Sequence, residues 1–307
     1  MDNYKFTKQQ NWLAFFFVCI FFGAGTAMAD RTIRVSGCIQ FDHDNTGYMG
    51  ADGVTVEIMD SDADFDDKLK EARTGKDGCF DTTINWKECL LCEADPDLYV
   101  KYVTKNGAVT VQSDWFEVDF SYRNPDKEDN YKGTHYKSEL YTATGDVRPL
   151  NIHTSITRAW RWLSNNPGYN TPHVDVQFTG TSDFYNAFWD EIFITGELEI
   201  KGIKYPGGGA HEYTHIHEYG HHWMHQFAYF DKNLGITGTE LSYNNDYCDG
   251  GPAPGTGHCA WCEEKPRIAF LEGWPHWMSD IIVRSLSKEY GIQFDHKSFE
   301  DIGLFSI

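Results

Sequence analysis

Three residues in the C-terminal half have the types and spacing of a metal-dependent hydrolytic site. His217 and His221 are four residues apart, and Glu218 directly follows the first of them. On an α-helix, residues four apart lie on one face, so both imidazoles can bind a single Zn²⁺ at about 2.0–2.1 Å. Glu218 would be rotated about 100° from His217, where its carboxylate can take a proton from a metal-activated water. The sequence therefore predicts Zn²⁺ as cofactor, two histidine ligands and a general base.

A catalytic zinc needs a third protein ligand and an open position. The first candidate is Glu272, the sole acid near the middle of a predicted apolar helix over residues 267–280. The alternative is His225, which lies two turns beyond His217 but is swung about 80° around the helix. Three further histidines are expected on the helix surface or partly in the core: His211, His215 and His222.

The His217-Glu218-x-x-His221 helix, followed by a helix with Glu272-Gly273, resembles the gluzincin metallopeptidases over about residues 190–283. This resemblance implies an α+β zincin-like catalytic domain that cleaves protein or peptide substrates. It also implies that His217, His221 and Glu272 are the zinc ligands and Glu218 is the general base. The Met-turn class is excluded, because Met224 and Phe227 stand where that class needs Gly and His.

Supporting residues are predicted around these ligands. His276 and Asp280 lie one and two turns beyond Glu272, and either can accept a hydrogen bond from a ligand imidazole. An oxyanion stabiliser is also required. Nothing in the sequence ranks its three candidates, which lie between the two motif helices: Tyr243, Tyr247 and His258.

Other elements of the C-terminal half are a helix over residues 152–163 and strands over 174–178 and 191–195. In the peptidases that the chain resembles, an edge strand before the metal helix pairs with extended substrate. Segment 191–199 is the candidate for that strand.

The N-terminal half reads as short strands separated by turns, which predicts an all-β sandwich. The expected strands are residues 32–40, 54–59, 79–84, 98–103, 108–112, 115–122 and 134–141. Segment 124–130 is polar and contains proline, so it is a linker or a loop before the last strand. We place the domain boundary near Asp146.

Three pieces of this half resemble the transthyretin-like β-sandwich modules: residues 35–37 with 53–58, 66–67 with 74–80, and 95–101. The resemblance implies a binding or positioning module without chemistry of its own. Two acidic loops, 42–47 and 60–67, predict either solvated loops or Ca²⁺ binding.

Residues 1–29 have the pattern of a cleaved secretory signal: Lys5 and Lys8, a short apolar run, and a site ending at Ala29. No later segment is long enough to span a bilayer. The full chain carries a net charge of −20, and cleavage would remove two lysines and one aspartate to give −21. Such acidity argues against nucleic acid and anionic membranes as partners. The predicted organisation is thus a signal (1–29), a transthyretin-like β-sandwich (30–145) and a metallopeptidase-like domain (146–307).

Seven of the eight cysteines remain after cleavage, and export favours disulfides. Cys38 with Cys79, and Cys248 with Cys259 or Cys262, are plausible pairs by domain, but the sequence leaves the connectivity open, and the odd count leaves one thiol over. The two C-x-x-C pairs, one beginning at Cys89 and the other at Cys259, are alternatively a structural zinc site.

Two other functions are open. One is a secreted binding protein whose zinc site is structural or inactive. The other is a zinc hydrolase of non-peptide amides or esters. The substrate specificity and the oligomeric state are not predicted from this sequence.

Overall fold

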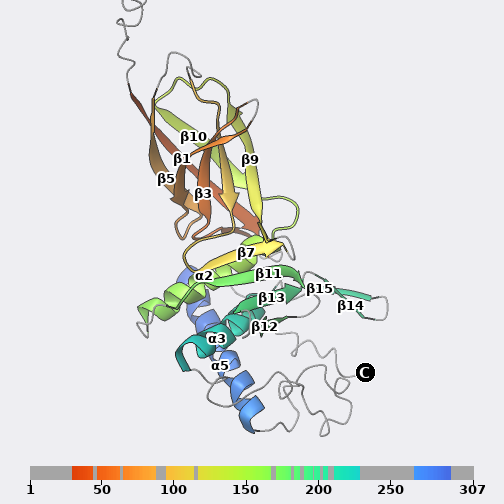
Figure 1. The fold of residues 1–307 in the computed structure, drawn as a ribbon. Helices are drawn as coiled ribbons and strands as arrows, with labels where there is room; N and C mark the ends of the chain where they lie inside the picture. Colours follow the sequence, from red (N-terminus) through yellow and green to blue (C-terminus); the bar gives the residue numbers. More distant parts are fainter. Residues whose placement is uncertain are drawn as a thin grey trace, which may run out of the picture.

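The computed structural model contains a β-sandwich and, below it in Figure 1, a further sheet with three helices. The structure describes residues 30–43, 47–62, 65–87, 95–113, 117–166, 171–180, 183–186, 190–195, 197–200, 203–206, 211–228 and 266–291. The predicted signal, residues 1–29, lies outside these ranges. Within them, no helix has the length and apolar character needed to cross a membrane.

Strand β1 (Arg31–Asp42) organises the first sheet of the sandwich. It pairs in parallel with β10 (His135–Thr142) and antiparallel with β2 (Tyr48–Gly50) and β5 (Cys79–Trp86). The second sheet is antiparallel, in the order β4 (Asp67–Arg73), β3 (Thr55–Asp60), β6 (Leu98–Val103) and β9 (Ser121–Glu128). Alternate positions of β1 are buried, as its sequence pattern predicts: Ile33, Val35, Ile39 and Phe41. The predicted sandwich is confirmed.

Most of segment 124–130 belongs to β9, which corrects its prediction as a linker or loop. In the described part of the chain, β9 is the outer strand of its sheet, and its pairing with β6 is irregular between Tyr99 and Lys101. Pro125 falls opposite that irregularity. Because proline lacks an N–H group, edge strands and irregular pairings are the places where a sheet tolerates it.

Cys38 and Cys79 form a disulfide, as predicted. They lie directly opposite each other on β1 and β5. Disulfides are typical of proteins that fold in an oxidising compartment. The other cysteine pairs lie outside the described residues.

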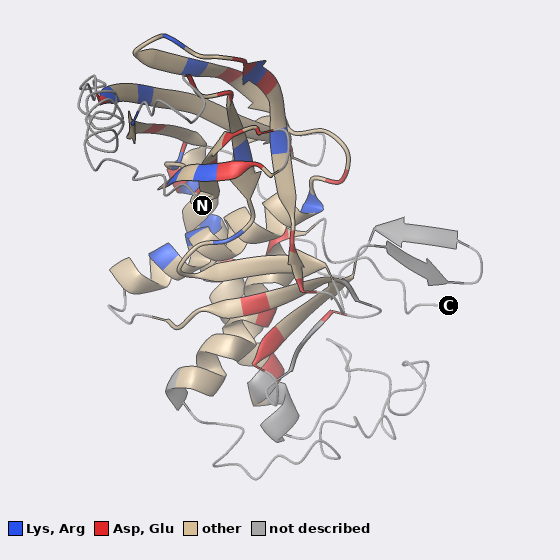
Figure 2. Cartoon of the chain, turned by 45° about the horizontal axis from the view of Figure 1, so that its top comes forward, with Lys and Arg blue, Asp and Glu red and all other residues tan. Residues whose placement is uncertain are grey.

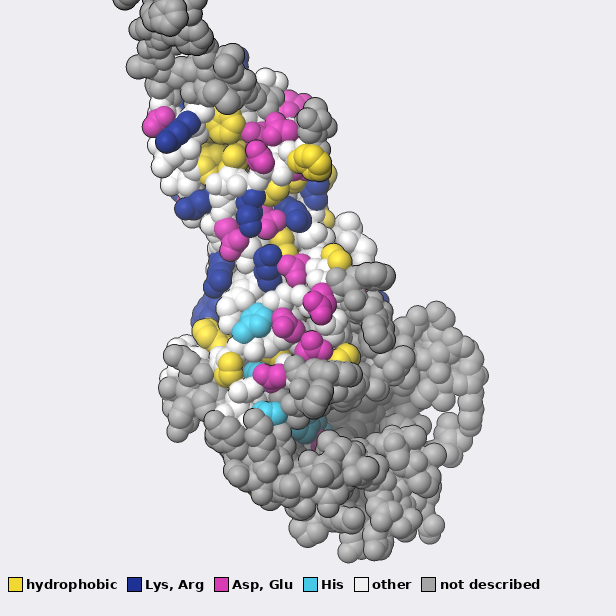
Figure 3. Space-filling view, in the orientation of Figure 1, with side chains coloured by type: hydrophobic (Ala, Val, Ile, Leu, Met, Phe, Trp, Pro, Cys, Tyr) yellow, Lys and Arg dark blue, Asp and Glu magenta, His cyan; other side chains and the backbone are white. Residues whose placement is uncertain are grey.

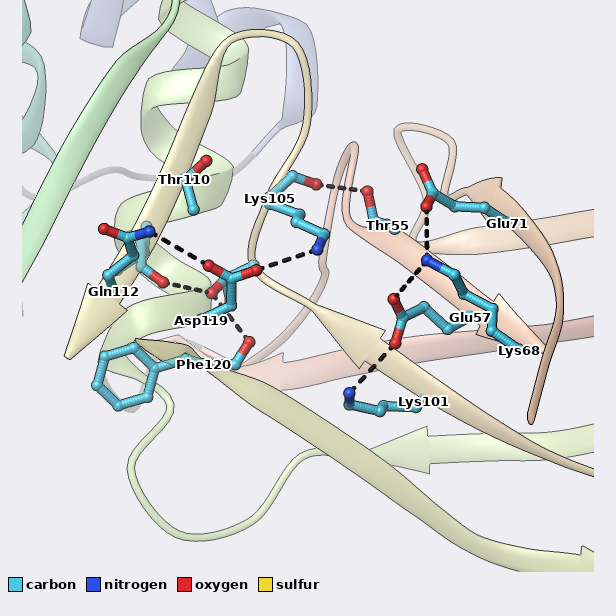
Figure 4. A network of polar contacts seen from close by, with 12 residues as sticks. Thr55, Glu57, Lys68, Glu71, Lys101, Lys105, Thr110, Gln112, Asp119 and Phe120 are labelled. Carbon is cyan, nitrogen blue, oxygen red and sulfur yellow. Dashed lines mark hydrogen bonds and ion pairs between the residues drawn. The ribbon is translucent and has the colours of Figure 1, made fainter. Parts of the chain in front are cut away.

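The chain leaves the sandwich after β6, forms β7 (Val109–Ser113) and β8 (Val118–Asp119), and returns as β9. Both strands pair within the third sheet, so their predicted place in the sandwich is corrected. The hydroxyl of Thr55 donates to the Lys105 carbonyl at 2.6 Å, and the Lys105 side chain pairs with Asp119 at 3.0 Å. These contacts hold the segment between β6 and β7 against both the sandwich and the third sheet (Figure 4). Strand β7 precedes Asp146 but belongs to the third sheet, so the sheet pairing crosses the predicted domain boundary near Asp146.

The third sheet has the order β12–β13–β11–β7–β8. Strand β11 (Val174–Gly180) is parallel to both β13 (Glu191–Thr195) and β7. Strand β12 (Phe184–Asn186) folds antiparallel onto β13. Since β13 is paired on both sides, segment 191–199 is not the edge strand that we predicted, and β12 takes that place. A separate hairpin consists of β14 (Glu197–Ile200) and β15 (Ile203–Pro206).

Within the described ranges, three helices accompany this sheet: α2 (Arg148–Asn165), α3 (Glu212–Ala228) and α5 (Pro266–Tyr290). Helix α2 contains the predicted helix 152–163 and packs against β7 and α3. Helix α3 packs against β12, β13 and α5. One continuous hydrophobic core runs from Ile33 of β1 to Leu286 of α5. The two parts are therefore joined through their interiors.

Acidic residues lie on strands of the third sheet (Figure 2). Asp175 of β11 and Glu191 of β13 are direct cross-strand partners. Burial raises the pKa of Glu191, and the nearby charges of Asp175 and Glu117 raise it further. Like charges opposite each other weaken a strand pair slightly.

His153 of α2 is fully buried beside Asn106. The Asn106 amide, which can only donate, lies 3.1 Å from Nε2 of His153. Burial lowers the pKa of this imidazole from 6.5 to about 3. Between these two values the unfolded chain binds a proton that the folded protein does not bind, so the folded state loses stability as the pH falls.

We expect the variant His153→Gln to be less sensitive to acid than the wild type. Glutamine keeps an acceptor for Asn106 but does not titrate, so the contribution of His153 disappears. In the wild type, the destabilisation caused by His153 is absent above pH 6.5. Below that pH it grows by about 1.4 kcal/mol per pH unit. Urea unfolding at pH 7.0, 5.5 and 4.5 measures the difference. Equal pH slopes for the two proteins would contradict the prediction.

Candidate metal centre

Helix α3 carries the complete His217-Glu218-x-x-His221 motif, as predicted. Its apolar side chains Tyr213, Ile216 and Tyr219 are buried in the core. Glu212 lies in its first turn, where a negative charge complements the helix dipole. The motif is thus held on a helix that the core fixes in orientation.

Helix α5 carries Glu272, also as predicted. The helix is continuous from Pro266 to Tyr290 and does not restart at Pro275, which lies inside it. The side chain of Glu272 is buried, with 8% of the residue exposed. Its environment is therefore unlike that of an ordinary solvated helix carboxylate.

Gly220, inside the motif, allows the two helices to approach closely. A Cβ atom at this position would lie 3.0 Å from Cα and Cβ of Pro275 and 2.9 Å from the terminal methyl of Met278. Such distances are shorter than ordinary carbon contacts. The glycine therefore sets the spacing between α3 and α5, and with it the distance from the histidines to Glu272.

The donor atoms of the three predicted ligands lie close together. Nε2 of His217 and Nε2 of His221 are 3.1 Å apart, and Oε2 of Glu272 lies 3.4 and 3.3 Å from them. Three donors bound to one tetrahedral zinc at about 2.0–2.1 Å would be about 3.3 Å from each other. The observed triangle has these dimensions, so the three side chains fit one metal ion.

These three residues are also the only cluster of three or more potential metal ligands among the described residues. His225 is not part of it. His211, His215 and His222 are all buried, which places them in the core rather than on the helix surface. Figure 3 shows histidine side chains on the part below the sandwich.

Burial lowers the pKa of His217 to about 4, although the neighbouring Glu272 carboxylate acts to raise it. The imidazole is therefore neutral near pH 7. A neutral imidazole has the lone pair that a metal ligand requires.

His276 lies beside His217, with ring centroids 4.3 Å apart. The Tyr213 hydroxyl is 2.9 Å from Nδ1 of His276 and 3.1 Å from its carbonyl oxygen. Because a carbonyl can only accept, the hydroxyl donates to it and accepts from Nδ1–H. This arrangement leaves Nε2 as the acceptor of the ring. Among the described residues, however, Nδ1 of His217 has no hydrogen-bond partner, so the predicted supporting role of His276 stays a prediction.

Asp280 forms an ion pair with Arg284 at 2.8 Å. Its predicted role in orienting a ligand imidazole stays a prediction. The candidate oxyanion stabilisers Tyr243, Tyr247 and His258 lie outside the described residues.

Asp190 anchors α3 to the third sheet and was not expected from the sequence. Its carboxylate lies 2.9 Å from Nδ1 of His222 and accepts from Gln226 at 2.7 Å. Asp190 directly precedes β13, so this contact fixes the sheet against the face of α3 that carries His222. Only its position before a strand, close to a metal helix, could have pointed to it.

The predicted Ca²⁺ loops receive no support from their described residues. Asp60 accepts from the backbone N–H of Asp97 at 2.7 Å, and Asp66 accepts from Tyr99 at 2.5 Å. These carboxylates are therefore occupied by protein donors. Parts of both loops lie outside the described residues, and Ca²⁺ binding stays a prediction.

We expect Gly220→Ala to weaken metal binding and Gly220→Val to weaken it much more. The added carbon pushes Pro275 by a few tenths of an ångström with alanine, and valine adds two further methyls to the same contact. Outer residues that only orient ligands typically change metal affinity about 10–100-fold, and we expect alanine near the lower end. Competition with a chromogenic chelator measures the affinity. The matched control is Gly273→Ala, because nothing lies within 4 Å of a Cβ there.

No known protein family matches the sequence, and no curated protein is detectably similar to it. Solved structures give weak similarities. A 9R-lipoxygenase from Cyanothece PCC8801 has 16% identity and a TM-score of 0.26, covering 45% of this chain and 25% of that chain. The plantain pollen allergen Pla l 1 has 11% identity and a TM-score of 0.22, covering 38% and 99%. The shaft pilin SpaA from Lactobacillus rhamnosus GG has 8% identity and a TM-score of 0.19, covering 38% and 52%.

The chain thus spans a quarter of the lipoxygenase. At these TM-scores the similarities carry no functional argument, and the site geometry alone must support a function.

Proposed function

We propose that this protein is a secreted zinc-dependent peptidase. The observation that carries the proposal is the triangle of donor atoms from His217, His221 and Glu272, with sides of 3.1–3.4 Å. Glu218 stands on the same helix, one residue from a ligand, and is buried. A metal-binding triangle beside a carboxylate that is not part of it supports hydrolysis by an activated water.

The donor set supports zinc. Two imidazoles and one carboxylate, with a fourth position open, are typical of catalytic zinc sites. The same donors also occur around non-haem Fe(II). Glu218 favours zinc, because a carboxylate next to the ligands has a direct role in hydrolysis as proton acceptor.

The chemistry follows from the side chains. Zn²⁺ held by the three ligands would polarise the scissile carbonyl and make a water more acidic. Glu218 accepts the proton of the attacking water and passes it to the leaving amine. This sequence of transfers requires no covalent intermediate.

The position of strand β12 favours a peptide as the substrate. It is the outer strand of the described sheet, and α3 packs against it. An extended peptide pairing with this edge would lie along the helix that carries His217 and His221. We therefore assign to β12 the substrate-pairing role that the sequence predicted for segment 191–199.

Cleavage of casein by the mature protein tests the proposal. We expect hydrolysis that stops with a zinc chelator and returns when zinc is added. A chromogenic ester and an N-acyl amide are assayed in parallel. Hydrolysis of these alone would favour the non-peptide hydrolase, and zinc binding without any hydrolysis would favour the binding protein.

A further inference from the structure

A buried polar contact links the sandwich to the start of the metal helix. His43 directly follows β1, and its Nε2 contacts the carboxylate of Glu212, the first residue of α3. The two residues are 2% and 1% exposed. Glu212 stands five residues before His217, and a buried carboxylate needs such a partner.

The electrostatics of this pair agree with the contact. Burial acts to raise the pKa of Glu212, but the hydrogen bond and the charge of His43 outweigh it, so the pKa lies below its usual value. The carboxylate is therefore ionised at neutral pH. An ionised carboxylate at a helix N-terminus is stabilised further by the helix dipole.

A second buried contact links the same region of the sandwich to the end of the other ligand helix. Asp52 is fully buried and accepts two hydrogen bonds from Arg161 of α2, at 2.6 and 3.0 Å. It also accepts from the hydroxyl of Tyr290, the last residue of α5, at 3.3 Å. The guanidinium of Arg158 lies 3.9 Å from the centroid of the Tyr290 ring. Asp52 thus joins α2 and α5 to the sandwich.

We propose that the β-sandwich is a structural part of the metal centre, and that His43 and Asp52 are positioning residues for the two helices that carry the metal ligands. This inference rests on the metal site of the proposed function but not on its peptidase activity. His43 holds the start of α3, and Asp52 holds the end of α5. The donor triangle depends on the relative placement of these two helices. Gly220 allows them to approach closely but does not fix their relative position along the helix axes.

The zinc affinity of variants tests this inference. In His43→Gln or Glu212→Gln, one buried partner loses its charge complement, and we expect zinc affinity to fall about 10–100-fold, as for residues that orient ligands. The double variant His43→Gln/Glu212→Gln restores a neutral hydrogen-bonding pair, and we expect it to recover most of the affinity. The matched control is His135→Gln, since His135 is an exposed sandwich histidine that contacts Ser36.

Amide hydrogen exchange of the wild-type protein requires no substitution, so it tests the inference even if a variant does not fold. Coupling between two sites is reciprocal. Zinc should therefore slow amide exchange in residues 47–53 of the sandwich and in residues 286–291, as well as around the ligands. Protection confined to the neighbourhood of the ligands would overturn the inference.

The outcomes separate the two proposals. Zinc binding that is unchanged in folded His43→Gln and Asp52→Asn overturns the inference alone. Zinc binding with the expected losses, but without peptide cleavage, overturns the peptidase and leaves the inference standing. A wild type that binds no zinc overturns both.

Discussion

Glu218→Gln is expected to reduce the turnover of peptide substrates about 10²–10⁴-fold while the protein still binds one zinc ion. General bases contribute factors of this size, and glutamine cannot accept the proton of the attacking water. Glu218 is not part of the donor triangle of His217, His221 and Glu272. Its removal should therefore separate catalysis from metal binding.

Steady-state cleavage of a fluorogenic peptide, with metal analysis of the same samples, measures both effects. The control is Glu289→Gln on α5, which removes a carboxylate from an exposed ion pair with Lys76. It should leave turnover unchanged. Equal turnover of wild type and Glu218→Gln would remove the assigned base, and loss of zinc in this variant would make Glu218 a ligand.

Glu272→Ala is expected to lower zinc affinity by more than the roughly 100-fold that residues orienting the ligands reach. It removes one of three protein donors and leaves two imidazoles whose Nε2 atoms are 3.1 Å apart. Glu272→Gln should bind zinc more weakly than the wild type but better than alanine, since an amide oxygen is a neutral and poorer donor.

The control for this series is Glu289→Ala on the same helix. Glu289 is exposed and paired with Lys76, and its loss should change zinc affinity little. Wild-type affinity in Glu272→Ala would show that the third ligand lies elsewhere, for example at His225. The chelator competition used for the Gly220 variants provides the measurement.

Local spacing was enough to predict the ligands. His217 and His221 are brought together by one helical turn, which needs no tertiary information. Glu272 was predicted as the sole acid near the middle of an apolar helix, together with the resemblance to the gluzincin peptidases. Their burial and mutual distances depend on how α3 packs against α5, which the spacing of residues within each helix does not reveal.

Pairing between distant strands was not predictable in the same way. The alternation in residues 108–112 identifies β7 as a strand but does not say which sheet it joins. Its partner β11 lies more than 60 residues further along the chain. The same reason explains why 191–199 was taken for an edge: the short strand β12 has little pattern of its own, and its hairpin with β13 covers that side.

Contacts between the sandwich and the helices were missed because they are single polar residues. His43 falls in an acidic loop, where a solvated or Ca²⁺-binding role was expected, and no role was predicted for Asp52. In the structure both are buried against charges from the helices. A polar residue in a loop gives no sequence signal for a partner 100 or more residues away.

X-ray absorption at the zinc edge of the mature protein distinguishes a site made of His217, His221 and Glu272 from a site made of cysteines. We expect one zinc per chain, coordinated by nitrogen and oxygen at about 2.0–2.1 Å, with imidazole scattering from His217 and His221. Sulfur at about 2.3 Å would contradict it, because zinc would then be bound by cysteines such as the pair Cys259 and Cys262 instead of His217, His221 and Glu272.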